Sequence, residues 1–137
     1  MTDRPVLVGF DGSEDADRAV RWAATYARAV GAPLEVVHTY DYPYLDRLGD
    51  DLGRQLHDAA AAAAEAGVAA ARAAEPTVSV EASVAVGEPA KVLVERSASA
   101  QLLVVGRQGS HRGLHHMLGS VAARCVHHAA CPVTVVR

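Results

Sequence analysis

The sequence predicts an α/β fold, in which a mostly parallel sheet carries helices on both faces. Strand-like and helix-like segments alternate along the 137 residues in the order β-α-β-α-β-α-β-α-β. Two of the strand-like segments, residues 6–10 and 102–105, are continuous apolar runs. Such runs are typical of central parallel strands, because helices cover these strands on both faces. Regular alternation of the two element types favours the same architecture.

The first helix is predicted between two sets of end signals. Ser13 is a natural N-cap after the Asp11-Gly12-Ser13 turn, and Glu14 and Asp15 suit the positive end of the helix dipole. Gly31 and Pro33 end the helix. Between these signals one apolar face follows helical spacing, at Ala16, Val20, Ala23, Ala27 and Val30.

Strands and helices continue in alternation after this helix. A second strand is expected over residues 34–39, then an irregular polar stretch over 41–51 and an Ala-rich helix over about 51–74. Gly67 is expected to bend this helix or weaken it by about 1 kcal/mol relative to Ala. Residues 78–86 alternate apolar and polar side chains, which predicts an edge strand with one buried face. The remaining expected elements are a helix over 90–98, the strand 102–105, a helix over 120–128 and a last strand, Val133–Val136.

Composition narrows the function classes. The formal net charge is −3, with acidic and basic residues mixed, so the basic patch of a nucleic-acid binder is absent from the sequence. No apolar run approaches the roughly 20 residues that span a bilayer. Cys125 and Cys131 form neither a disulfide framework nor a metal-ligand spacing. The sequence opens directly into a strand without a secretory pattern, so we expect one cytoplasmic domain over residues 1–137.

A glycine-rich segment directly follows the central strand 102–105. Gly106 and Gly109 are separated by two residues, and Gly119-Ser120 follows nine residues later, at the start of a helix. Glycines let backbone N–H groups wrap a phosphate chain, and a helix N-terminus adds a positive dipole. Ligands of open α/β sheets bind at the carboxyl ends of the strands, where the strand order reverses. Asp11-Gly12-Ser13 lies at the end of the other apolar strand.

Simpler interpretations exist for the same residues. The glycines can serve only as tight turns, Asp11 can bond its own backbone, and Ser120 can act as an N-cap. Arg107 and Arg112 either contact phosphates or solvate the loop, and the lack of a loop lysine favours phosphate contact for at least one of them. Histidines gather nearby at His111, His115, His116, His127 and His128, but neither adjacent pair, His115-His116 nor His127-His128, has the i, i+4 spacing of a helical zinc site, which favours solvent-facing positions.

The spacing Gly106-x2-Gly109-x9-Gly119-Ser120 resembles the nucleotide-binding signature of the universal stress protein family. The resemblance continues at residues 8–13, 36–39, 87–89 and 131–133, in the order found in that family, and so covers the whole chain. Two departures are Gln101, where relatives often carry Asp, and the His115-His116 pair, where small or apolar residues are common.

The resemblance implies a three-layer α/β/α sandwich of the adenine nucleotide alpha hydrolase-like type, with five parallel strands in the order 3-2-1-4-5. The nucleotide, ATP in members with this signature, would lie between strands 1 and 4. Asp11 would lie near the nucleotide or its Mg²⁺ or Mn²⁺ ion, and the backbone of Thr39 would face adenine. The complete set of nucleotide contacts implied is Gly9, Asp11, Thr39, Gly106, Arg107, Gly109, Ser110, His111, Arg112, Gly119, Ser120 and Val121.

The function expected from this resemblance is an ATP-dependent regulator of stress or growth state with little or no hydrolysis. The sequence contains no G-x4-G-K-[ST] loop and no obvious base for activating water. The alternatives are a slow Mg-dependent ATPase, a cyclic AMP-binding protein, and an interaction module that acts through its dimer surface. Val133–Val136 is expected to lie at a sheet edge and to form a homodimer with a second copy. The downstream protein partner is not determined by the sequence.

Overall fold

The computed structural model describes residues 3–41, 49–109 and 118–137. Its elements alternate strictly between strand and helix, as the sequence predicts. In chain order they are β1 (Val6–Gly9), α1 (Glu14–Val30), β2 (Leu34–Tyr40), α2 (Asp50–Ala74), β3 (Val80–Val86), α3 (Pro89–Ser97), β4 (Leu102–Gly106), α4 (Ser120–His128) and β5 (Val133–Val136).

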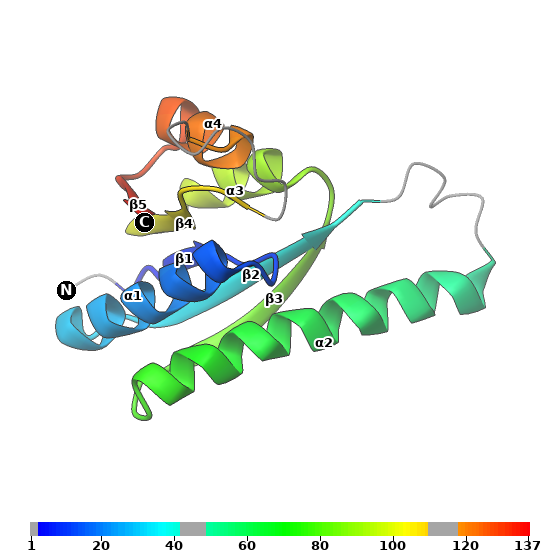
Figure 1. Cartoon of the computed structure of the whole chain (residues 1–137), viewed down its shortest axis with the longest axis horizontal. Helices are drawn as coiled ribbons and strands as arrows, with labels where there is room; N and C mark the ends of the chain where they lie inside the picture. Colours follow the sequence, from blue (N-terminus) through cyan, green and yellow to red (C-terminus); the bar gives the residue numbers. More distant parts are fainter. Residues whose placement is uncertain (1–2, 42–48, 110–117) are drawn as a thin grey trace.

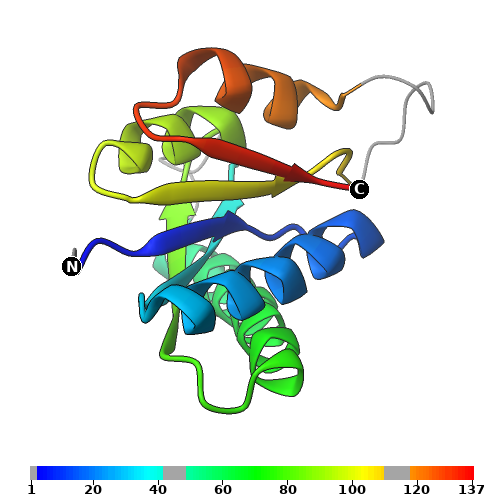
Figure 2. The same cartoon turned by 90° about the vertical axis from the view of Figure 1, so that its left-hand side faces the viewer.

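The five strands form one parallel sheet in the order β3-β2-β1-β4-β5. The predicted fold class and strand order are therefore confirmed, with β1 and β4 inside the sheet and β3 at an edge. Helices α1 and α2 cover one face and α3 and α4 the other (Figures 1 and 2). After β1 the chain adds β2 and β3 on one side, and then β4 and β5 on the other side of β1, so the strand order reverses between β1 and β4. None of the helices in the described residues is long and apolar enough to cross a membrane.

Two hydrophobic clusters hold the layers together, one on each face of the sheet. Val6 and Val8 of β1 point into the cluster under α1 and α2, whereas Leu7 points into the cluster under α3 and α4. Ala23 and Ala27 of α1 are completely buried, because small side chains let this helix lie close to the sheet. Val30, which the sequence places on the same apolar face, is instead 41% exposed at the end of the helix.

The ends of α1 follow the sequence signals. The hydroxyl Oγ of Ser13 accepts a hydrogen bond from the backbone N of Ala16 at 3.1 Å, which confirms the predicted N-cap. Gly31 ends the helix in the left-handed conformation at φ 70°, and its N–H bonds back to the carbonyl of Arg28.

Gly67 of α2 has a packing role that the sequence does not reveal. A Cβ atom at this position would lie 2.7 Å from Cγ1 of Val36 and 3.0 Å from the ring of Phe10. Glycine is thus what allows α2 to approach β2 closely. The expected loss of helix propensity at Gly67 is offset by this contact between the layers.

Burial along β3 differs from the predicted alternation. The strand begins at Val80 rather than at residue 78, and Val86 at its far end is 50% exposed. The reason is the sheet register: β2 pairs with β1 only as far as Val37 but continues beside β3 to Tyr40. The last residues of β3 therefore extend past the central strands that would bury them (Figure 1).

Candidate functional site

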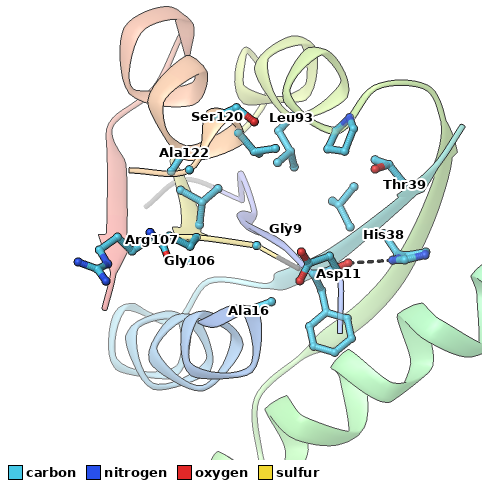
Figure 3. A pocket seen from close by; sticks show the side chains of 18 of the residues that line it. Gly9, Asp11, Ala16, His38, Thr39, Leu93, Gly106, Arg107, Ser120 and Ala122 are labelled. Atoms are coloured by element: carbon cyan, nitrogen blue, oxygen red, sulfur yellow. Dashed lines mark hydrogen bonds between the residues drawn. The ribbon is translucent and has the colours of Figure 1, made fainter. Parts of the chain in front are cut away.

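A cavity of about 550 Å³ opens at the carboxyl ends of β1 and β4 (Figure 3), where the strand order reverses. Its wall comes from the β1–α1 turn, the end of β2, the first turn of α3, the segment after β4 and the start of α4. The volume lies within the range of small-molecule sites, about 300–1,000 Å³. This is the position at which open α/β sheets bind ligands.

Most of the predicted site residues line this cavity, although they come from four separate segments of the chain. They are Gly9, Asp11, Thr39, Gly106, Arg107, Gly109, Gly119, Ser120 and Val121. The other predicted contacts, Ser110, His111 and Arg112, lie outside the described residues.

Asp11 both shapes its turn and borders the cavity. Its Oδ1 accepts a hydrogen bond from the backbone N of Ser13 at 3.0 Å, as expected of a turn-forming aspartate. Its Oδ2 lies beside Gly109, because a Cβ atom built on Gly109 would be only 2.6 Å from that oxygen. The two interpretations of Asp11, turn former and cavity residue, are thus compatible.

The start of α4 differs in one respect from the sequence interpretation. Gly119 is the N-cap and Ser120 is the first helical residue, so the alternative in which Ser120 caps the helix is wrong. No side chain caps this end among the described residues, and Ser120, Val121 and Ala122 line the cavity. The first-turn N–H groups and the positive dipole end therefore border the cavity, which favours an anionic group there.

Gly119 is tied to the segment after β4. Its N–H donates to the carbonyl of Arg107 at 2.8 Å, and a Cβ atom at Gly119 would lie 3.2 Å from Cα of Gln108 and 3.3 Å from that carbonyl oxygen. The glycine thus permits close contact between the loop and the helix start, and both border the same cavity.

Arg107 reaches the cavity mainly through its backbone. Its N–H donates to the carbonyl of Val136 at 2.9 Å, which joins it to β5. Figure 3 shows the Arg107 side chain directed away from the middle of the cavity. A phosphate contact by the guanidinium would require another side-chain rotamer.

Three further residues shape the site without having been predicted from the sequence. His38 lines the cavity, and its Nδ1 donates to the carbonyl of Phe10 at 2.8 Å (dashed line in Figure 3). Since a carbonyl only accepts, Nδ1 carries the proton. Glu88 lines the cavity from the start of α3 and forms an ion pair with Arg124 of α4. His38 and Glu88 lie in the segments 36–39 and 87–89, where the sequence resembles the family, and this resemblance was the sequence signal that could have identified them.

Asp15 is the third residue, and it does not line the cavity. Its carboxylate accepts a hydrogen bond from the backbone N of Gln108 at 3.1 Å, across 93 positions of sequence. From the sequence Asp15 looks like an ordinary acidic residue in the first turn of a helix. No signal in the sequence indicates its contact with the loop.

The described wall of the cavity includes charged residues of both signs, with Arg107 as the basic one. Asp11 and Glu88 contribute carboxylates, and no lysine lines the described wall. No group of three or more His, Cys, Asp or Glu side chains that could hold a metal ion occurs in the part of the chain that the structure describes.

Comparison with known proteins assigns the chain to a family. The sequence profile of the universal stress protein family matches residues 3–137. The chain belongs to the universal stress protein family. The universal stress protein Rv2623 of Mycobacterium tuberculosis is 38% identical over 142 residues, which cover 96% of this chain and 46% of that protein. The chain spans about half the length of the curated relatives that it matches.

Solved structures of this family share the fold. A universal stress protein in complex with cAMP is 29% identical, with a TM-score of 0.73 over 98% of this chain and 96% of that one. The universal stress protein from Archaeoglobus fulgidus in complex with dAMP is 25% identical, with a TM-score of 0.73 over the whole of both chains. The predicted family resemblance is thereby confirmed.

Proposed function

We propose that this chain binds an adenine nucleotide, with ATP as the physiological ligand, and acts as a nucleotide-dependent regulator of stress or growth state. The observation that carries the proposal is the start of α4, which no side chain of the described residues caps, beside Gly109 and Asp11 in one cavity at the strand-order reversal. Relatives solved with cAMP and dAMP support an adenine nucleotide as the ligand class.

The cavity offers different surfaces to the two ends of such a ligand. The phosphates would lie beside Gly109 and Gly119, which let the ligand approach the backbone, and at the first turn of α4, whose N–H groups point out of the helix start. The base would lie toward the end of β2, beside the backbone of Thr39 and the apolar side chains of Val37 and Leu93. Asp11, next to Gly109, would meet the divalent ion that accompanies a triphosphate.

Little or no hydrolysis is part of the proposal. The Asp11 carboxylate is engaged with the Ser13 backbone, and the Glu88 carboxylate with Arg124. A general base must be within hydrogen-bond reach of the attacking water and ready to take its proton. Neither carboxylate has an arrangement built for that task. We therefore expect ATP turnover far below about 1 s⁻¹, the lower end of ordinary enzyme rates.

Cyclic AMP is the second candidate ligand, because a relative at 29% identity was solved in complex with it. Isothermal titration calorimetry with ATP, cyclic AMP, dAMP and GTP, each with Mg²⁺, separates the candidates. The proposal requires ATP to bind more tightly than GTP and at least as tightly as cyclic AMP. If cyclic AMP binds more tightly than ATP, cyclic AMP and not ATP is the ligand of this cavity. Absence of binding by all the adenine nucleotides would overturn the proposed function.

A further inference from the structure

One peptide group of the segment after β4 is hydrogen-bonded on both sides. The carbonyl of Arg107 accepts from the N–H of Gly119 at 2.8 Å, and the N–H of Gln108 donates to Oδ2 of Asp15 at 3.1 Å. These two groups belong to the same peptide unit, which is planar. Its orientation is therefore fixed by α4 on one side and by α1 on the other.

Asp15 itself is held firmly in the first turn of α1. Its side chain is 12% exposed, and its second oxygen, Oδ1, pairs with Arg18 one turn later. The turn also packs directly against the end of β4: a Cβ atom on Gly106 would lie 2.8 Å from the backbone carbonyl of Asp15. The carboxylate therefore has little freedom to leave Gln108.

We propose that Asp15 is a positioning residue, which holds the ligand-binding segment Gly106–Gly109 in its binding geometry before any nucleotide arrives. Asp15 does not line the cavity, so its influence on a ligand is indirect. The predicted effect of Asp15 on nucleotide affinity rests on the proposed function. The fixed orientation of the peptide group does not, because it is a property of the ligand-free protein.

The physical reason is preorganisation. A hydrogen bond from a backbone N–H to a carboxylate is charge-assisted and stronger than a neutral one. It lies in a buried place, where an unmade bond would be costly. A loop already fixed by such a bond loses less conformational entropy when a ligand binds, so more of the contact energy appears as affinity. Gly109, which borders the cavity, directly follows the fixed peptide.

The test compares two substitutions at Asp15 with a control in the same helical turn. Asp15→Ala removes the acceptor, whereas Asp15→Asn keeps one oxygen that can accept from Gln108 but removes the charge. Asp17→Ala is the control, because Asp17 lies two residues on, its side chain is 39% exposed, and among the described residues that side chain pairs with Arg21 rather than with the loop. Two quantities are measured: hydrogen exchange of the backbone amide of Gln108, by NMR without ligand, and the affinity for ATP, by calorimetry.

We expect Asp15→Ala to speed exchange of the Gln108 amide and to weaken ATP binding, each about tenfold. Asp15→Asn and Asp17→Ala should keep both quantities within about threefold of the wild type. If Asp15→Ala changes neither quantity, or if Asp15→Asn is as impaired as Asp15→Ala, the positioning role is wrong.

The wild-type protein gives an independent decision. An unprotected Gln108 amide in the ligand-free protein would overturn the inference without any variant, even if Asp15→Ala did not fold. Conversely, a wild type that protects this amide but binds no ATP would refute the proposed function and leave the fixed peptide established.

Discussion

The carboxylate of Asp11 lies against Gly109, so closely that a Cβ atom on the glycine would be 2.6 Å from Oδ2. The contact joins the turn after β1 to the segment after β4. These two strands are neighbours in the middle of the sheet, where the strand order reverses. It also brings a negative charge to the place where the proposed ligand carries its phosphates. We expect a cation to lie between the carboxylate and the phosphates, because it would offset their repulsion.

Binding of ATP should therefore depend on a divalent ion. We expect removal of Mg²⁺ with EDTA to weaken ATP binding about tenfold or more, because Asp11 and the triphosphate then repel each other. Asp11→Asn should reduce this dependence. Asparagine retains an oxygen that can accept from the N–H of Ser13, so the turn is kept and only the charge is lost. Calorimetry of both proteins with and without Mg²⁺ measures the effect. If EDTA leaves the ATP affinity of the wild type unchanged, Asp11 does not contact a metal ion.

Gly119→Val should abolish ATP binding. Even a Cβ atom there would lie 3.2 Å from Cα of Gln108, and the branched side chain would displace the loop from the start of α4. We expect an affinity loss of at least about a hundredfold, which leaves no binding measurable by calorimetry on protein shown to be folded by circular dichroism. Gly53→Ala, at a position with nothing within 4 Å, is the control and should bind normally. Unchanged affinity in Gly119→Val would place the nucleotide elsewhere.

Two glycines of the same helix should respond in opposite ways to alanine. Gly67→Ala should destabilise the fold by about 1–2 kcal/mol, because the overlap with Val36 and Phe10 outweighs the gain in helix propensity. Gly53→Ala should stabilise it by about 0.5–1 kcal/mol, since nothing surrounds that position. Urea denaturation measures both, and an increase in stability on Gly67→Ala would contradict the close approach of α2 to the sheet.

Stability should fall at alkaline pH in part through Cys125. Burial raises the pKa of this thiol from 9.0 to about 11, opposed by Arg124 and reinforced by Cys131. The neutral thiol thus stabilises the folded state below pH 9, and this contribution disappears as the pH rises through 11, because the unfolded chain loses its proton first. The full contribution is roughly 2–3 kcal/mol.

The corresponding variant is Cys125→Ala. The free energy of unfolding of the wild type should decline more steeply between pH 9 and 11 than that of the variant, as measured by urea denaturation at each pH. Parallel declines in the two proteins would show that Cys125 ionises in the folded state as it does in the unfolded chain.

We propose that a second copy pairs with β5. Among the described residues β5 pairs only with β4, and on that side the carbonyls of Pro132 and Val136 accept hydrogen bonds from the N–H groups of Leu103 and Arg107. Since successive peptide groups of a strand point to opposite sides, the N–H and C=O groups of Val133 and Val135 face the open edge. Light scattering should give a mass near twice 14.3 kDa. Val135→Pro should shift it toward the monomer, because proline removes an outward N–H while sparing the ladder to β4. A wild type that is monomeric at micromolar concentration would contradict the pairing.

Much of the site could be predicted from the sequence because its residues follow strands. Thr39 lies in β2, and Gly9 and Gly106 end β1 and β4; parallel strands end at the same edge of the sheet, so their last residues meet. The glycine spacing then indicated which edge loop carries the ligand. The predicted helix over 120–128 agrees with α4, but the sequence left open whether Ser120 caps it, since both Gly119 and Ser120 are acceptable caps and only the backbone geometry distinguishes them.

The sequence by itself determined the alternation of elements, the central and edge strands, and the position of Asp11 and of the glycine segment at the ends of the two apolar strands. These depend on local periodicity, end signals and the rules of parallel sheets. Only the tertiary structure decided that Gly67 allows α2 to pack closely on the sheet and that Glu88 pairs with Arg124. The same holds for the hydrogen bond from the Gln108 backbone N–H to Asp15. Each of these depends on the distance between segments far apart in the chain, to within a few tenths of an ångström. Side-chain periodicity carries no such information, because close packing fixes those distances only once the layers have come together.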